Sequence, residues 1–68
     1  MVDIWKYANN LPKVLLTVKD GNTYLGNLVC VMDGEETDEA EDSLTLEEEN
    51  GMIHIFFQSE IADIREQR

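Results

Sequence analysis

The sequence predicts a mostly β domain in which a bent hairpin, a second hairpin and a short last strand form one antiparallel sheet. Residues 13–18 and 24–32 are apolar runs with the alternation of strands that have one buried face. Asp20-Gly21 lies between them, and this pair is a strong signal for a type I′ hairpin turn. Gly26 stands early in the return strand, where a glycine marks a bulge or a sharp bend. A long strand bent in this way can curl a short chain into a small barrel.

The length of the chain limits how it can be stabilised. Its 68 residues are enough for a single domain, which we expect to span residues 1–68. A core of this size rarely supplies more than about 3–5 kcal/mol. One cysteine, Cys30, cannot form an internal disulfide, and one histidine with one cysteine does not make a four-ligand zinc site, so we expect no metal and no other cofactor. Self-association is the remaining source of stability, and we expect a homo-oligomer.

No feature of the sequence suggests a secreted or membrane protein. The N-terminus lacks a basic region followed by an apolar core, and no apolar run approaches the roughly 18 residues of a membrane helix. We therefore expect a cytoplasmic protein with no membrane partner. Cys30 lies in an apolar run, where a buried small hydrophobe is the more common role than a nucleophile.

The charge is concentrated in one stretch. The net charge of −10 argues against tight binding of nucleic acid over the whole surface. Residues 33–49 hold ten of the 15 acids and no base, so the remaining five acids are matched by five bases. Residues 34–42 are too charged to pack a core and are expected to form a mobile acidic loop. Their spacing matches no EF-hand, so a solvated or partner-facing loop is favoured over a cation site.

The first eleven residues are predicted to form a short helix. Val2, Ile4, Trp5 and Ala8 have roughly helical spacing, and Pro12 follows the expected end of the helix. Two roles remain open for this helix. It is either a lid whose Trp5 plugs an open end of the barrel or a surface for a partner.

The second half of the chain predicts three more strands. Residues 44–46 and 52–57 flank an Asn50-Gly51 turn, and residues 61–64 form the last short strand. Residues 52–57 are apolar on both faces, so one face can enter the barrel while the other meets a neighbouring subunit. The predicted oligomer interface consists of Met52, His54, Phe56, Ile61 and Ile64.

Catalysis is not expected. His54 is the only histidine of the chain, and histidine is the residue type most often used as a base near neutral pH. On an apolar strand it is more often a structural residue than a base, and no serine or cysteine stands at a triad-like spacing. We therefore predict no catalytic residue and no enzyme activity.

This order of elements resembles the Sm-like (LSm) family. The first motif of that family is best matched by Val18-Lys19-Asp20-Gly21, Tyr24, Gly26, Leu28 and the apolar run that ends at Asp33. The second is matched in outline by Ile55-Phe56-Phe57 and Ile61-x-x-Ile64. The resemblance implies an N-terminal helix followed by a strongly bent five-stranded antiparallel sheet. It also implies rings in which the fourth strand, residues 52–57, pairs with the fifth strand, residues 61–64, of the next subunit.

The chain departs from the family at the residues that bind RNA. The family continues its first motif with a Met-Asn pair that contacts a base, whereas this chain continues Asp33-Gly34-Glu35-Glu36-Thr37. The Arg-Gly of the second motif is replaced by Phe57-Gln58-Ser59-Glu60.

Two functional hypotheses follow. The favoured one is a non-enzymatic, ring-forming binding module that acts as a scaffold for protein or ribonucleoprotein assembly and meets a basic protein partner. The alternative is an Sm-like protein that recognises single-stranded RNA through the ring pore or face, with Tyr24, Asp33 and Gln58 as ligand residues and weak affinity. The positions of the five basic residues distinguish the two hypotheses. If they cluster on one face of the ring, RNA binding is favoured; if they are scattered, the scaffold is favoured. These residues are Lys6, Lys13, Lys19, Arg65 and Arg68.

Overall fold

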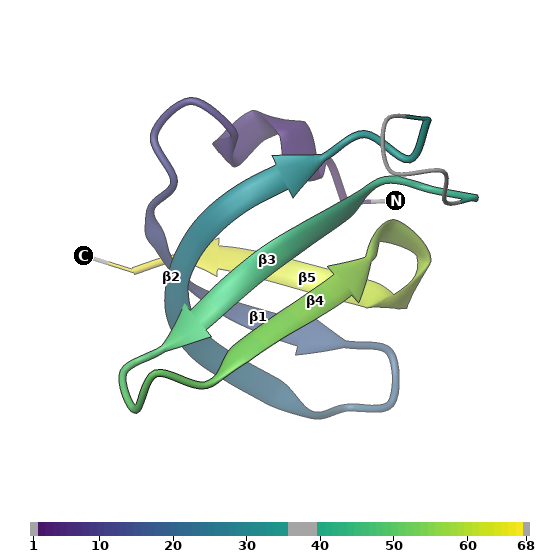
Figure 1. Cartoon of the computed structure of the whole chain (residues 1–68). Coiled ribbons are helices and arrows are strands. Elements are labelled where there is room, and N and C mark those ends of the chain that lie inside the picture. The colour runs from purple at the N-terminus through teal and green to yellow at the C-terminus, as the bar shows by residue number, and fades with distance from the viewer. Residues whose placement is uncertain (1, 36–39, 68) are drawn as a thin grey trace.

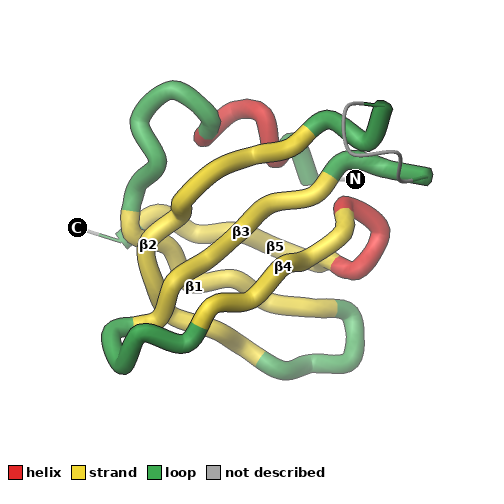
Figure 2. The backbone as a smooth tube through the Cα atoms, in the orientation of Figure 1, coloured by secondary structure: helices red, strands yellow, loops and turns green. Residues whose placement is uncertain are grey.

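The structure, a computed structural model, describes residues 2–35 and 40–67. These residues form five strands and two short 3-10 helices (Figures 1 and 2). In chain order the elements are η1 (Ile4–Tyr7), β1 (Lys13–Val18), β2 (Thr23–Met32), β3 (Ser43–Glu48), β4 (Ile53–Phe57), η2 (Gln58–Glu60) and β5 (Ile61–Glu66).

The strands form one antiparallel sheet in the order β4-β3-β2-β1-β5. The prediction of a mostly β, five-stranded antiparallel domain is thus confirmed. The sheet is not closed into a barrel, because β4 and β5 are its two edges and do not pair with each other. Closure would need a ladder between these two edges, and the described residues contain none.

The bend of the sheet lies in β2. Its first half pairs with β1 as far as Asn27, and its second half pairs with β3 from Gly26 onward. The register with β3 shifts between Leu28 and Cys30, as in a β-bulge. The strand therefore curves through both ladders as one long arc (Figure 1). The strand is bent as predicted, but its register shift lies beyond Gly26, between Leu28 and Cys30.

Gly26 permits this curvature because it has no side chain. A Cβ atom at this position would lie 2.4 Å from the carbonyl oxygen of Glu47 and 2.9 Å from the side chain of Leu46. The backbones of β2 and β3 thus approach more closely here than any other residue would allow.

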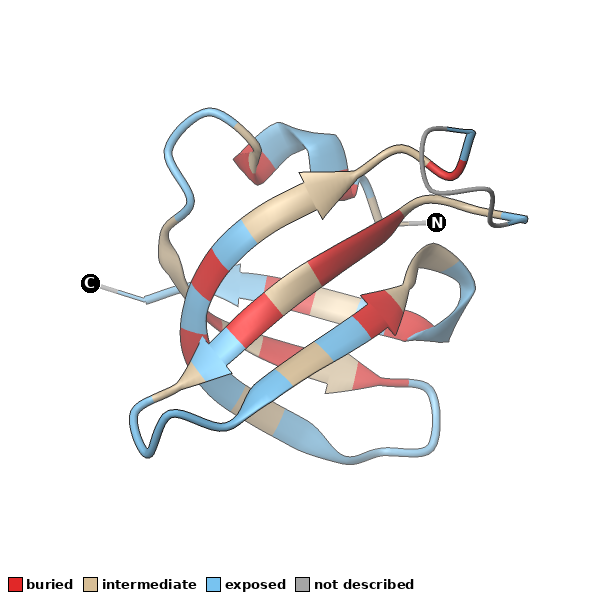
Figure 3. Ribbon diagram, in the orientation of Figure 1, coloured by how far each residue is buried: buried red, intermediate tan, exposed pale blue. Residues whose placement is uncertain are grey.

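One face of the bent sheet carries the hydrophobic core. Val14, Leu16 and Val18 alternate with half-buried residues along β1, as the sequence pattern predicts. The core side chains come from all five strands and from η1 (Figure 3). Among the described residues the core consists of Ile4, Tyr7, Val14, Leu16, Val18, Leu28, Leu44, Leu46, Phe56, Ile61 and Ile64.

The prediction of a helix over residues 1–11 is wrong. Only a four-residue 3-10 helix forms, and its first turn is capped by Asp3, whose Oδ1 accepts a hydrogen bond from the Trp5 N–H at 3.1 Å. One turn is enough to bury Ile4 and Tyr7, which are three residues apart and so share one face of a 3-10 helix. A longer helix would have had no further apolar face to bury, and short helices need tertiary packing to persist.

The predicted plug by Trp5 is also not found. The Trp5 side chain is 43% exposed, and Ile4 and Tyr7 occupy the core in its place. No helix in the described part of the chain is long and apolar enough to cross a membrane.

The close approach at Gly26 makes a testable prediction. In a Gly26→Ala variant the new Cβ would collide with a backbone oxygen, which cannot rotate away as a side chain can. We expect the sheet to separate locally at a cost of roughly 1–3 kcal/mol of unfolding free energy, measured by urea denaturation. The matched control is Asn27→Ala at the exposed neighbouring position, which should change stability by less than about 0.5 kcal/mol. Equal effects of the two substitutions would show that the contact does not constrain the sheet.

Candidate functional site

A cluster of three rings lies on the inner face where β2 and β4 face each other. The Tyr24 ring is 4.9 Å from His54 and 5.0 Å from Phe56, measured between centroids, and the His54 and Phe56 rings stack at 5.8 Å. His54 Nε2 is 3.3 Å from Glu48 Oε1 but lacks hydrogen-bond geometry. These contacts make His54 a packed residue of the ring cluster.

Two shallow hollows lie on either side of Lys19, where the β1–β2 turn meets η2. The first has a volume of about 670 Å³, and the second has a volume of about 390 Å³. Gln58 lines the first hollow, and its side-chain amide donates a hydrogen bond to the carbonyl oxygen of Val2. Tyr24 lines the second hollow, and Asp33 lines neither. Neither of these two hollows brings together the three residues predicted to bind RNA.

The residues predicted for the oligomer interface fall into two groups. Phe56, Ile61 and Ile64 are buried in the core of the chain itself, whereas Met52 is 55% exposed and His54 is half-buried. The interface itself stays a prediction.

The exposed apolar side chains of β4 are Ile53, at 55%, and Ile55, at 62%. The alternation of residues 52–57 in the sequence places Ile53 and Ile55 on the opposite face from Phe56, but it does not show which face points into the core. The pairing of β4 with β3 shows this, because Phe56 lies opposite the buried Leu44.

The backbone of β4 leaves hydrogen-bonding groups at an open edge. The Glu48 N–H donates to the Met52 carbonyl, and the Gln58 N–H donates to the Asp42 carbonyl, both at 2.9 Å. Hydrogen-bonded pairs alternate along an antiparallel ladder. His54 and Phe56 therefore bond to β3, and the N–H and C=O groups of Ile53 and Ile55 point away from the sheet.

The same reasoning applies to β5 at the other edge. The Gln67 N–H donates to the Lys13 carbonyl at 2.8 Å, so Arg65 and Asp63 are the residues that bond to β1. The N–H groups of Ile64 and Glu66 consequently point outward. The Ile64 carbonyl accepts a long hydrogen bond of 3.4 Å from the Tyr7 hydroxyl.

Asp42 joins three separate segments at the end of the acidic stretch. Its Oδ1 accepts from the Gly34 N–H at 2.9 Å, and its Oδ2 accepts from the Trp5 indole Nε1–H at 2.8 Å. Its carbonyl accepts from the Gln58 N–H. The hydrogen bonds from Gly34 and then from Trp5 lower the pKa of the Asp42 carboxyl below its ordinary value of 3.8.

The described ends of the acidic stretch are thus more ordered than the sequence suggested. Gly34 is buried, and a Cβ there would lie 2.7 Å from the backbone of Glu41. Glu41 itself accepts hydrogen bonds from the backbone N–H and the hydroxyl of Ser59, at 2.6 and 3.0 Å. Within the predicted mobile loop of residues 34–42, only residues 36–39 lie outside the described residues. The described parts of the chain contain no group of three or more side chains suited to a metal ion.

The four basic side chains in the described part of the sequence come from different strands, turns and helices. Lys13 Nζ is 3.0 Å from Glu49 Oε1, and Arg65 Nε is 2.9 Å from Asp63 Oδ2. Lys6 lies over the Tyr7 ring at 5.7 Å, and Lys19 is in the β1–β2 turn. Two of these four charges are therefore matched by carboxylates, and the four come from different elements; Arg68 lies outside the described residues.

Comparisons of the chain with protein-family models, with curated proteins and with solved structures give no match in any of the three. The resemblance to the Sm-like family therefore remains a prediction from the sequence motifs.

The contacts of Asp42 predict a pH-dependent contribution to stability. Because folding lowers its pKa, the carboxylate stabilises the fold above about pH 4, and this contribution is lost as the pH falls through the lowered pKa. We expect Asp42→Asn to unfold at lower urea than the unmodified protein at pH 7, with a difference that disappears near pH 2. Fluorescence of Trp5, the one tryptophan of the chain, gives the readout.

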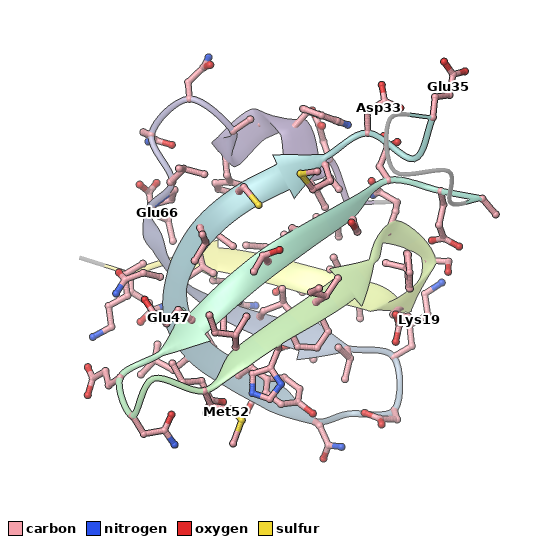
Figure 4. The ribbon with its side chains drawn as sticks, in the orientation of Figure 1. Lys19, Asp33, Glu35, Glu47, Met52 and Glu66 are labelled. Atoms are coloured by element: carbon pink, nitrogen blue, oxygen red, sulfur yellow. The ribbon has the colours of Figure 1, made fainter. Side chains whose placement is uncertain are left out.

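The control for this experiment is Glu66→Gln, which removes an exposed carboxylate at the end of β5 (Figure 4). We expect a smaller effect, because the described residues give the Glu66 side chain no hydrogen bond. A second variant, Trp5→Phe, removes one donor to Asp42 and should destabilise the protein in the same pH range, followed by circular dichroism because this variant has no tryptophan. If Asp42→Asn and Glu66→Gln behave alike at every pH, then Asp42 does not join the segments as described.

Proposed function

We propose that the chain is a non-enzymatic binding module that assembles into Sm-like rings and acts as a scaffold for protein or ribonucleoprotein complexes. The observation that carries this proposal is that β4 and β5 are the two edge strands of one antiparallel sheet, and that the outer edge of each pairs with no other strand of the described residues. In the proposed ring, β4 of one chain pairs with β5 of the next. Such a head-to-tail contact uses two different surfaces and closes into a ring when the rotation between subunits permits.

The chemistry of β4 supports pairing at this edge. The N–H and C=O groups of Ile53 and Ile55 point outward, and their side chains are more than half exposed. An exposed apolar edge strand is a template for pairing with another chain, and monomeric proteins normally block it with charge, proline or a covering segment. Pairing would also add buried area to a domain of 68 residues, whose own core is small.

Ring assembly is tested by blocking the edge backbone without disturbing the sheet. The unmodified protein should show several times the monomer mass by light scattering at micromolar concentration. Ile55→Pro removes an N–H that bonds to nothing in β3, and proline is tolerated in edge strands. We expect this variant to keep its circular dichroism spectrum and to show the mass of a single chain.

The matched control is Ile55→Thr, which shortens the apolar side chain but keeps the N–H group. It should still assemble, at higher protein concentration. A monomeric unmodified protein, or an Ile55→Pro variant that assembles normally, would overturn the proposed ring.

The alternative, specific RNA binding, is opposed by the electrostatics. Each subunit carries a charge of −10, and two of its described cations are paired with carboxylates. Affinity for RNA depends largely on free cations that displace counterions from the phosphates. We therefore expect oligo-U to bind with a dissociation constant above about 10 μM at 0.15 M salt, measured by fluorescence anisotropy. Submicromolar, uridine-selective binding would contradict this and make Tyr24, Asp33 and Gln58 the first residues to mutate.

A further inference from the structure

The outer face of β2, β3 and β4 carries a patch of apolar side chains. Residues that lie directly opposite each other on neighbouring strands point to the same face. Phe56 and Leu44 form an inward pair, so the alternate rows point outward. These rows pair β2 with β3 and β3 with β4. We define the outer patch as their apolar members and Thr45: Cys30, Met32, Thr45, Ile53, Ile55 and Phe57.

The outer patch is open to solvent in the single chain. Ile53 and Ile55 are more than half exposed, and Cys30, Met32 and Phe57 are partly exposed. An exposed group of apolar side chains on a small protein marks a site of interaction.

Acidic residues lie at both ends of the outer patch. Glu47 is the cross-strand partner of Ile53 and so shares its face. At the other end, Asp33 and Glu35 follow Met32 at the end of β2. Figure 4 shows Glu47 on β3 and, beyond the far end of β2, Asp33 and Glu35.

This distribution of charge selects among possible occupants of the patch. A second copy docked face to face through a two-fold axis would bring the same acidic ends together, and each copy carries a charge of −10. Like charges held together in an interface oppose binding, and an anionic membrane surface is opposed for the same reason. A segment with Lys or Arg on either side of an apolar stripe meets both ends of the patch favourably.

The kind of element follows from the geometry of a sheet. An added strand binds at the edge of a sheet, where the backbone groups are free, whereas a sheet face is covered by a helix or by another sheet. The outer patch is a face that spans three strands. An amphipathic helix that lies across the three strands is the element that fits this face.

We propose that the outer patch is the docking surface for a basic amphipathic helix of a partner protein. The inference rests on the proposed function as a binding module and specifies its partner. It does not depend on the closure of a ring, because it uses outward side chains and not the edge backbone.

The test uses two synthetic amphipathic helical peptides of equal length with the same leucine stripe. One peptide carries lysine on both flanks of the stripe and the other carries glutamate. Binding to the whole protein is followed by fluorescence anisotropy. We expect the lysine peptide to bind at least about tenfold more tightly than the glutamate peptide, and to weaken as salt is raised.

Variants of the protein locate the site. Ile53→Thr combined with Ile55→Thr should weaken binding of the lysine peptide by about tenfold. The control is Leu25→Thr, which replaces an apolar side chain of 44% exposure outside the patch and should change nothing. Glu47→Gln should weaken the lysine peptide and reduce its salt dependence, whereas Glu66→Gln on β5 should not. The two glutamate variants keep the test valid if the double threonine variant fails to fold.

The outcomes distinguish the docking surface from a dimer interface and from the proposed ring. Equal binding of the two peptides, or an equal loss in the Leu25 and the double threonine variants, would overturn the docking surface. A dimer that the double threonine variant abolishes, without peptide binding, would show a second copy to be the occupant. A protein with the mass of one chain that still binds the lysine peptide at the patch would overturn only the proposed ring.

Discussion

The close contact between Gly26 and the carbonyl oxygen of Glu47 is the constraint on which the rest of the structure depends. β2 pairs with β1 on one side and with β3 on the other, and both ladders include Gly26 and Asn27. At Gly26 the two backbones lie so close that an added Cβ would be 2.4 Å from a backbone oxygen, so only glycine fits there. The curved sheet, its enclosed core and its two separated edges all follow from that contact.

The parts of the fold that could be predicted from the sequence are those set by local chemistry. Alternation in residues 13–18, the Asp20-Gly21 turn and the Asn50-Gly51 turn each specify a structure within a few residues of themselves. Gly21 and Gly51 have positive φ angles, 98° and 88°. Asp20 and Asn50 do not, so the predicted type I′ geometry is wrong; each glycine instead ends a turn, with its N–H donating to the carbonyl of Val18 or Glu48. Gly26 predicted a bend because a residue without a side chain allows backbones to approach closely and strands to bend.

The parts that could not be predicted depend on contacts between distant residues. The N-terminal pattern fits an α-helix, but the core accommodates only Ile4 and Tyr7, so one 3-10 turn suffices. Nothing in the acidic stretch distinguishes Asp42 from its neighbours, and its role arises from Trp5, 37 residues away. Phe56 turns inward because of its register with Leu44. The alternation of residues 52–57 shows two faces but not which of them the core will take.

The hydrogen bond from the Gly34 N–H to Asp42 has a consequence for which changes this sequence can tolerate. This hydrogen bond joins Gly34 to Asp42, two residues that are eight positions apart, at the base of the acidic stretch. The end of β2 and the start of β3 are therefore held together at this point. Doubling the length of a flexible loop costs only about 0.6 kcal/mol of closure entropy. Changes of length or charge between Glu35 and Ala40 can therefore leave this junction intact, whereas Glu41 keeps its own contacts with Ser59. The charge offered to a partner can change there while the sheet stays the same.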